Sequence, residues 1–477
     1  MNSVSVVSTA RMDKKMRVIY TIEAMLEYFV ALSVSNTYLP KLCDIIGVSD
    51  TFKPIIVGIG TIGSSMQLLT LLVYDKAPFK IWITIAQTIA HLFYASLWFV
   101  PSLRTPETVK IILFVTCVLF ATALQNVVYA PKAAWMMTFV DEDKRGKFTS
   151  VKEIVSLIGG ILFTLAFGKV ADGNTEQAFA LCGLISLSSG LLHTISLAVS
   201  HEKPYRKVPH EKGIVRRLVG NKAFLKVQLL GIMWYATIDS FIPLFATYQY
   251  ATYGLSMSTF VVSIITASSS LVRALLSQPL GRLADKTSFS KMLNVCFFIE
   301  IGALCSAAIA FPVSEWYSVA TCAGFWVLYH AGYAGINSVF FNIMFDYVEP
   351  KERTAAIALS CAARGLGAFA ATFAVSMLAS FIRSAGLTVG GLKIDGIHIF
   401  ALVAILMTVC TMLYNRNVIR KLKRAKYSAF DQESETDADE KPQYVRSEAD
   451  SDASGDYDNA TGKEPINESG SGQKTAP

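Results

Sequence analysis

Two glutamates lie four residues apart inside the first apolar run of the chain, RVIYTIEAMLEYFVALSV. On an α-helix this spacing places Glu23 and Glu27 on one face. Because a helix rises about 1.5 Å per residue, Glu27 lies about 14 Å beyond Val18, near the middle of a hydrocarbon layer about 30 Å thick. A carboxyl group at that depth is partly desolvated, which makes its protonated form less costly. We expect both acids to carry protons, and the alternative is that each is a buried acid paired with a base, Tyr or Asn.

A third acid, Asp239, lies in the run WYATIDSFIP, and three bases also lie inside apolar runs. Ionisable side chains in such runs mark functional sites by default. Arg273 and Arg364 suit a carboxylate, because a guanidinium donates two parallel hydrogen bonds. They bind either an anionic ligand or one of the nearby acids, Glu153, Glu300 and Asp239. Lys152 is near a polar connection, where its ammonium group can reach water.

Neutral polar side chains complete a candidate binding site. Gln125, Asn126 and Tyr129 share one run, and His330, Tyr333 and Asn337 share another. Several aromatic residues could hold an apolar ligand body, and ordinary helix packing is the alternative for each: Trp234, Tyr235, Phe241, Tyr329 and Tyr333. The expected ligand-binding residues are Arg273, Arg364, His330, Tyr333, Asn126 and Asn337.

Long apolar helices must position these groups. Hydrophobic residues make up 53% of the 477 residues and charged residues 17%, which is too apolar for a water-soluble fold. Twelve runs are long enough to cross a bilayer: 18–39, 54–74, 81–100, 109–138, 147–169, 178–199, 224–248, 257–280, 290–311, 316–347, 354–382 and 397–415. The first run contains two acids and is too long for the core of a signal peptide. The prediction is therefore an all-α membrane protein with twelve transmembrane helices.

Lysine and arginine in the connections set the expected orientation. Placing the amino terminus in the cytoplasm puts twenty-seven of these bases on the cytoplasmic side and seven on the other. The predicted segments are a cytoplasmic N-tail (1–17), a six-helix bundle (18–199), a basic linker (200–223), a second six-helix bundle (224–415) and a cytoplasmic tail (416–477). From residue 431 the tail contains thirteen acids and four bases, so we expect it to be disordered. The expected location is the cell membrane.

A small charged element occurs in both halves. DKAPF at Asp75 matches DKTSF at Asp285, 210 residues later. FVDEDKRGKFTS matches YVEPKERTAAIA when Arg145 is aligned with Arg353, 208 residues later. Two elements with nearly one offset indicate a duplicated six-helix unit, and repeats of this kind place a solute site between the halves near the midplane.

The stretch GRLADKTSF resembles the cytoplasmic loop between helices 8 and 9 of the major facilitator superfamily, whose counterpart lies between helices 2 and 3. DEDKRG and EPKERT resemble the loops after helices 4 and 10 in that family, and the resemblance covers about residues 18–415. YDKAPFK departs from the pattern, since it lacks the leading glycine and the later basic residues. The resemblance implies a cavity lined by helices 1, 4, 7 and 10, and gating roles for Asp285, Asp75, Arg145 and Arg353. Asp75 would approach helix 11 near Thr354, and Asp285 would approach helix 5 near Phe148.

Other signals exclude enzymes. GIGTIG (58–63) follows no strand, so its glycines indicate close helix contact, not a dinucleotide site. The sequence contains no G-x-x-x-x-G-K-[ST], H-E-x-x-H or G-x-S-x-G motif, and its eight cysteines lack metal-ligand spacing. We expect no enzymatic activity, no cofactor, no metal and no nucleic-acid partner.

The leading hypothesis is a monomeric secondary transporter of a small organic solute, coupled to protons through Glu27 and Asp239. An amphipathic organic anion such as a bile-acid carboxylate is the expected substrate. The first alternative is a proton-antiporting exporter of lipophilic cations. The second is a transporter-like sensor that signals through its acidic tail.

Overall fold

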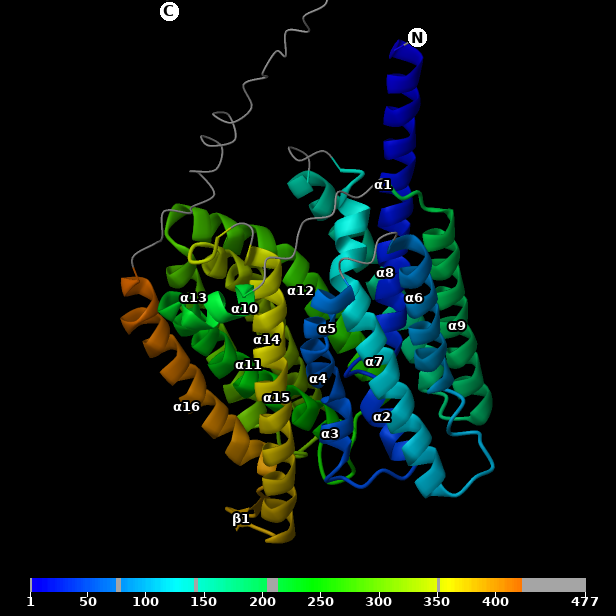
Figure 1. The fold of residues 1–477 in the computed structure, drawn as a ribbon. Coiled ribbons are helices and arrows are strands. Elements are labelled where there is room, and N and C mark those ends of the chain that lie inside the picture. The colour runs from blue at the N-terminus through cyan, green and yellow to red at the C-terminus, as the bar shows by residue number, and fades with distance from the viewer. Residues whose placement is uncertain (1, 74–78, 141–144, 204–212, 350–351, 423–477) are drawn as a thin grey trace, which may run out of the picture. The chain divides into compact units, whose positions relative to one another are not determined.

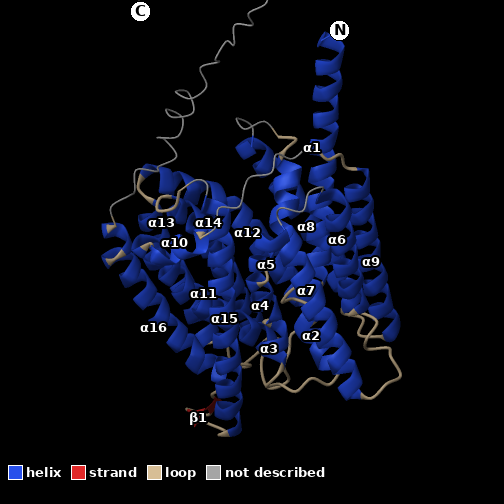
Figure 2. Ribbon diagram, in the orientation of Figure 1, coloured by secondary structure: helices blue, strands red, loops and turns tan. Residues whose placement is uncertain are grey.

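Helices make up nearly all of the regular structure in the computed structural model, which describes residues 2–73, 79–140, 145–203, 213–349 and 352–422 (Figure 2). The helices of the amino-terminal half are α1 (Asn2–Ser33), α2 (Leu39–Ile45), α3 (Lys53–Val57), α4 (Ile59–Ser65), α5 (Gln67–Val73), α6 (Phe79–Ser96), α7 (Glu107–Met137), α8 (Arg145–Ala171) and α9 (Glu176–Val199). The helices of the carboxy-terminal half are α10 (Ile214–Gly220), α11 (Lys222–Tyr248), α12 (Thr259–Lys286), α13 (Phe289–Ala308), α14 (Glu315–Phe345), α15 (Arg353–Ser384) and α16 (Gly396–Asn417), with a short 3₁₀ turn, η3 (Ile419–Lys421).

A two-stranded hairpin joins α15 to α16. Strand β1 (Thr388–Val389) pairs antiparallel with β2 (Leu392–Lys393). The two turn residues, Gly390 and Gly391, have φ values of 57° and 81°, and tight hairpin turns of this kind need positive φ at both positions. The hairpin therefore reverses the chain within a few residues.

Eight helices within the described residues are long and apolar enough to cross a membrane. They lie at Glu107–Met137, Val151–Ala171, Glu176–Val199, Lys222–Tyr248, Thr259–Ala284, Phe289–Ala308, Ala355–Ser384 and Gly396–Lys421. The four other predicted runs correspond to α1, the series α3 to α5, α6 and α14. The chain is thus a multi-pass membrane protein, and the full count of twelve spans remains a proposal.

The run expected as one helix at 54–74 is broken into α3, α4 and α5. The first break is at Gly58, and the second is at Met66. Glycine is a poor helix former, and two hydroxyls bond their own backbone: Thr61 Oγ1 donates to Gly58 O and Ser65 Oγ to Ile62 O. Such local bonds bend helices. The close helix contact predicted for GIGTIG occurs at Gly58 and Gly63, where an added Cβ would collide with Thr372 and Thr122 respectively.

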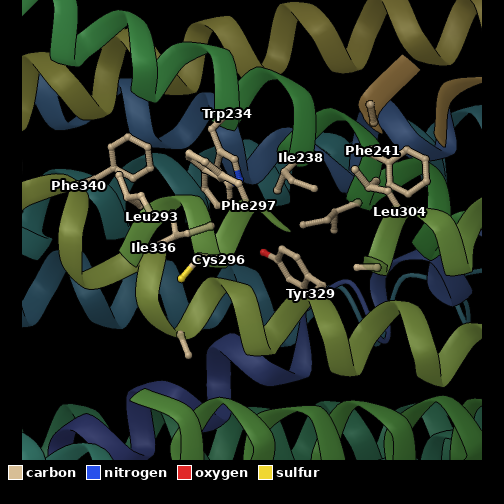
Figure 3. Packing of buried hydrophobic residues seen from close by; sticks show 14 of the residues in the cluster. Trp234, Ile238, Phe241, Leu293, Cys296, Phe297, Leu304, Tyr329, Ile336 and Phe340 are labelled. Carbon is tan, nitrogen blue, oxygen red and sulfur yellow. The ribbon is translucent and has the colours of Figure 1, made fainter. Parts of the chain in front are cut away.

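Buried apolar side chains form separate cores in the two halves. The largest core contains only residues from α10 onward, and Figure 3 shows part of it around Trp234, Phe297 and Phe340. Two smaller cores lie in the amino-terminal half, one around Trp98 and one around Trp135.

Two helix pairs make the most extensive contacts between the halves within the described residues, and α2, α3 and α5 also contact α11 or α15. α8 packs against α12, and α4 packs against α15 (Figure 1). Glycines permit both approaches, because a Cβ on Gly168 would collide with Ser263 and one on Gly365 would collide with the carbonyl oxygen of Thr61. The space between these seams contains the site described next.

Candidate functional site

Three adjoining cavities follow one another, the first and third lined by residues of both halves and the second by the amino-terminal half. The first, about 410 Å³, is lined by α11, α14 and α15 together with α3 and α4. The second, about 350 Å³, shares Asn36, Val57, Gly60 and Ser64 with the first. The third, about 410 Å³, shares Ala31 and Gln125 with the second. We call these three spaces together the central cavity.

A buried group of charged side chains lies beside the central cavity in the amino-terminal half. The Lys132 ammonium on α7 contacts Glu23 Oε1 at 2.7 Å and Glu27 Oε2 at 2.5 Å. His193 Nε2 on α9 lies 2.7 Å from the same Glu23 oxygen. We call Glu23, Glu27, Lys132 and His193 the Glu–Lys–His cluster. The two acids therefore lie on one face of α1 as predicted, and each is paired with a base, which was the alternative to a proton-carrying role.

The two glutamates differ in their surroundings. The Glu23 side chain is 0% exposed and Glu27 is 16% exposed. Glu27 lines the central cavity and accepts a hydrogen bond from Gln87 Nε2 at 3.3 Å. Glu23 lies behind it, so of the two predicted proton carriers only Glu27 contacts the cavity.

Sequence reasoning did not identify Lys132, His193 or His91. Lys132 lies within an apolar run directly after Pro131, and the rule that selected Arg273 applies to it equally. The His91 ring lies edge-to-face against His193, with ring centroids 4.6 Å apart. The sequence was therefore sufficient to select the ionisable side chains of α6, α7 and α9 as candidates. That these side chains meet the two glutamates of α1 depends on the fold.

The carboxy-terminal half contributes Asp239, Arg364 and three tyrosines to the cavity lining: Tyr235, Tyr329 and Tyr333. The Arg364 guanidinium lies 4.6 Å from the centre of the Tyr235 ring, and that of Arg273 lies 5.0 Å from the Tyr333 ring. A guanidinium group stacked on an aromatic face donates its hydrogen bonds in its own plane, and Arg364 Nε donates to Ser360 O at 3.1 Å. The predicted aromatic lining is thus found for the tyrosines, whereas Trp234 and Phe241 lie in the core.

The other predicted ligand-binding residues have different positions. Asn126 lines the cavity, donates to Thr122 O at 2.9 Å and accepts from Gln67 at 3.2 Å. Arg273 lines it together with Lys152 and Glu153. His330 lies outside the lining, and its Nδ1 is 2.9 Å from Trp326 O. Asn337 is in α14, but its side chain lies outside the described residues.

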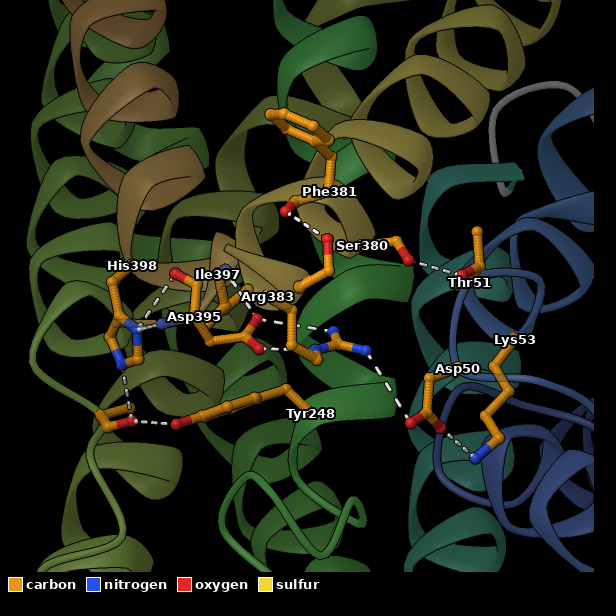
Figure 4. Close-up of polar contacts among 12 residues, drawn as sticks. Asp50, Thr51, Lys53, Tyr248, Ser380, Phe381, Arg383, Asp395, Ile397 and His398 are labelled. Carbon is orange, nitrogen blue, oxygen red and sulfur yellow. Dashed lines mark hydrogen bonds and ion pairs between the residues drawn. The ribbon is translucent and has the colours of Figure 1, made fainter. Parts of the chain in front are cut away.

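Polar contacts near the hairpin end of the helices join the halves through Arg383, which also pairs within its own half (Figure 4). Arg383 Nε donates to Asp395 Oδ2 at 2.6 Å, and Arg383 Nη1 lies 3.8 Å from Asp50 Oδ2. Thr51 Oγ1 lies 2.6 Å from Ser380 Oγ. We call Asp50, Thr51, Ser380, Arg383 and Asp395 the closing cluster.

Three further contacts near this end join the halves. Thr37 Oγ1 lies 3.0 Å from Thr266 Oγ1, Tyr38 OH lies 3.1 Å from Ser263 Oγ, and Tyr250 OH donates to Thr37 O.

Lys53 supports the closing cluster from α3. It pairs with Asp44 and, at 2.6 Å, with Asp50. Burial lowers the pKa of Lys53, but hydrogen bonds to these two carboxylates outweigh it, so the pKa lies above its usual value.

Three of the predicted gating residues, Arg145, Asp285 and Arg353, lie at the opposite end of their helices. Asp75 is outside the described residues. Asp285 is within α12 and Arg145 begins α8, but their side chains are also outside the described residues. Arg353 begins α15, with its guanidinium 5.0 Å from the centre of the Phe345 ring. Their gating roles remain predictions.

Comparison with known proteins gives one family. The model described as Major Facilitator Superfamily matches residues 28–372. Among curated proteins, no relative matches the chain.

Several solved transporter structures are similar to this chain. A D-xylose-proton symporter shares 12% identity and a TM-score of 0.68, covering 86% of this chain and 98% of its own. The nucleoside transporter NupG has 14% sequence identity and a TM-score of 0.61, and the match covers 86% of this chain and 100% of NupG. An auto-inhibited peptide transporter of the POT family shares 13% identity and a TM-score of 0.64, covering 87% and 99%. Identities this low establish a common fold.

Proposed function

Since the chain belongs to the Major Facilitator Superfamily and is a multi-pass membrane transporter, not an enzyme, we propose that it moves a small organic solute across the cell membrane by alternating access. The observation that carries this proposal is the central cavity, which lies between the halves and is lined by charged side chains from both. Repeated halves with a site at their interface are the usual arrangement of secondary transporters.

The arrangement in the membrane follows from charge. We propose twelve spans in two six-helix bundles, with both termini and the basic linker in the cytoplasm. Lys203, Arg217, Lys286 and Arg420 lie at the end where α1 enters the bundle, and we call this the basic end. An excess of lysine and arginine favours the cytoplasmic side. The separate apolar cores of the halves support the division near residues 200–223.

The conformation follows from the position of the closing cluster. Its contacts join the halves at the end opposite the basic end, so this structure corresponds to a state closed on the outside. In alternating access, the two halves rock about the solute site and open one end at a time. Opening the outside then requires the Asp50 to Arg383 and Thr51 to Ser380 contacts to separate.

The proposed substrate is an amphipathic organic anion. Arg273 and Arg364 present guanidinium groups, which bind carboxylates through two hydrogen bonds. Tyr235, Tyr329 and Tyr333 offer apolar ring surface next to them. A steroid-like carboxylate combines these two features. The alternative, export of a lipophilic cation, uses Glu27 and Asp239 as the anionic partners.

Proton coupling is the second part of the proposal. Glu27 and Asp239 line the cavity in opposite halves, so each can exchange a proton with the solvent that enters. Glu23 acts with them through Lys132, which it shares with Glu27. The D-xylose-proton symporter has a similar fold, which supports the proposal because this fold is compatible with proton coupling.

Proteoliposome uptake tests both parts. Radiolabelled glycocholate, which carries a carboxylate, is the anionic probe and tetraphenylphosphonium the cationic one, each measured with and without an imposed pH gradient. We expect gradient-driven glycocholate accumulation that Glu27→Gln and Asp239→Asn abolish, while Lys393→Gln on the exposed hairpin leaves it unchanged. Accumulation that survives both acid substitutions would contradict proton coupling through these residues, and movement of the cation alone would favour the exporter.

The sensor alternative has its own test. Deletion of residues 428–477 removes the acidic tail, which lies outside the described residues. We expect uptake by the truncated protein to match that of the full chain. Loss of a cellular response with uptake intact would favour signalling as the main role.

A further inference from the structure

The Glu–Lys–His cluster has the donor atoms of a cation site. The carboxylate oxygens of Glu23 and Glu27 and a ring nitrogen of His193 lie within 4.8 Å of one another. Two carboxylates and an imidazole form a donor set that binds cations. The position between the two carboxylates is filled by the Lys132 ammonium, at 2.7 Å and 2.5 Å.

Two further atoms of the Glu–Lys–His cluster make no hydrogen bond within the described part of the chain and could act as ligands for an ion. Glu23 Oε2 and His193 Nδ1 are buried without a hydrogen-bond partner among the described residues. Glu23 is 0% exposed, and buried polar atoms without partners are uncommon. These atoms border the same buried group, so removal of the ammonium would leave several oxygen and nitrogen ligands around one vacated position.

We propose that Lys132 is the resident cation of this site, and that its tethered ammonium excludes sodium and other alkali ions from it. The inference deepens the proposed function, on which it rests, because it identifies Lys132 as the residue that determines which ion is coupled. With the cation position filled by the chain itself, only a proton can alter the charge of the cluster.

Covalent attachment gives the ammonium its advantage. A free ion loses translational freedom when it binds, whereas the lysine side chain is already confined near its site and acts at a high effective concentration. Sodium would also have to displace a side chain that is 4% exposed. The displaced ammonium would then lose both carboxylate partners within a buried site, where an unpaired charge is costly.

Groups on neighbouring helices do not replace the lysine. Gln87 on α6 donates to Glu27, and the His91 ring lies edge-to-face against His193. Lys152 on α8 lies over the Tyr20 ring at 4.9 Å and faces the cavity. The contacts described for the Lys152 ammonium do not include either glutamate, so Lys132 is the base that bridges the two.

Thermal unfolding of the purified full-length protein in detergent tests the proposal. Wild type, Lys132→Ala and Lys132→Met are compared in sodium chloride, lithium chloride and choline chloride at equal ionic strength. We expect equal Tm values for wild type in all three salts. Lys132→Ala should have a lowered Tm that rises with sodium or lithium concentration and not with choline, because an ion that binds only the folded state stabilises it.

Lys132→Met is the matched control. It removes the charge and keeps the volume, so it should lower the Tm without any recovery in sodium. Adding Glu23→Gln to Lys132→Ala should abolish the sodium response. The same salt response from the Ala and Met variants would overturn the proposal, and so would sodium-specific stabilisation of wild type.

A second measurement covers the case in which Lys132→Ala does not fold. Replacing all three charges together, as Glu23→Gln, Glu27→Gln and Lys132→Met, removes the unpaired charge and should restore a folded, sodium-insensitive protein. Binding of radioactive sodium to wild type should equal that of this triple variant. Higher binding by wild type would refute the inference. Because no solute is used, failure of this test is distinct from failure of the uptake experiment.

Discussion

Two glutamates with equal burial have opposite surroundings. Glu23 is 0% exposed and contacts Lys132 and His193. Glu300 on α13 is also 0% exposed, yet both its carboxyl oxygens are without a hydrogen-bond partner among the described residues. Gly332 on α14 provides the space for it, since a Cβ there would lie 2.9 Å from Glu300 Cγ. Burial alone therefore does not distinguish an ion-paired acid from an isolated one.

The same substitution should have different effects at these two positions. Glu300→Gln keeps the shape and removes no ion pair, so we expect the free energy of unfolding to change by less than about 1 kcal/mol. Glu23→Gln leaves the Lys132 and His193 pairing incomplete and should cost about 3 to 5 kcal/mol. Thermal unfolding in detergent measures both. Equal losses from the two variants would show that Glu300 has a partner of similar strength.

The fold brings together residues that the sequence identified one at a time. Glu27, Asp239, Arg273 and Arg364 were selected because they are ionisable groups within apolar runs, and all four line the cavity. Lys132 satisfies the same rule and was overlooked. The closing cluster was not predictable in this way, because Asp50 and Asp395 lie in polar connections where a charge is normally solvated.

At the scale of elements, glycine determines how closely the halves approach. Gly365 on α15 faces the carbonyl oxygen of Thr61 and the Ser64 Cβ, with an added Cβ 3.1 Å from the latter. Gly60, in the same short helix as Thr61, has no atom within 4 Å of its added Cβ among the described residues. The break between α3, α4 and α5 was not predicted, because hydropathy detects the length of an apolar run and not a local bend.

Alanine at these two glycines should give opposite results. Gly365→Ala introduces a methyl group into the α4 to α15 contact and should cost about 1 to 3 kcal/mol of stability. Gly60→Ala adds a better helix former to open space and should be neutral or stabilise by up to about 1 kcal/mol. Unfolding temperatures of the two variants, purified in parallel, provide the comparison. Destabilisation by Gly60→Ala of the same size would contradict the proposed role of this seam.

At the scale of the whole transporter, the closing cluster links the halves through few side chains. Arg383 contacts Asp50 across the interface and Asp395 within its own half, and it lies 3.7 Å from the Tyr253 ring centre. Cys361 lines the central cavity and is a native reporter of access.

Arg383→Gln should weaken closure of the outer end. We expect faster modification of Cys361 by a membrane-impermeant maleimide added from the outside of proteoliposomes, because one charged contact between the halves is lost. Mass spectrometry of the modified peptide measures it. Lys393→Gln, on the exposed hairpin, is the control and should leave the rate unchanged, and an unchanged rate in Arg383→Gln would argue against its role.

A disulfide between the halves should trap the outward-closed state. Thr51→Cys with Ser380→Cys replaces two hydroxyls 2.6 Å apart, and oxidation should prevent labelling of Cys361 from outside until a reductant is added. Thr88→Cys with Thr194→Cys is the matched control. Its hydroxyls are 2.9 Å apart within one half, so its oxidation should not affect access. Outside labelling of the oxidised Thr51 and Ser380 pair would show that the cavity opens by another route.

The contacts between Thr37 and Thr266 and between Tyr38 and Ser263 are made by hydroxyl groups, which bond to water as readily as to one another. Each such bond contributes about 0.5 to 1.5 kcal/mol net, because water replaces the lost partner as soon as the seam parts. When these contacts part, water can therefore bond to the hydroxyl groups that they leave. The hydrogen bonds of this seam therefore add little to the barrier for opening. The rate of the transport cycle should depend more on solvent viscosity than on hydrophobic contacts between the two halves.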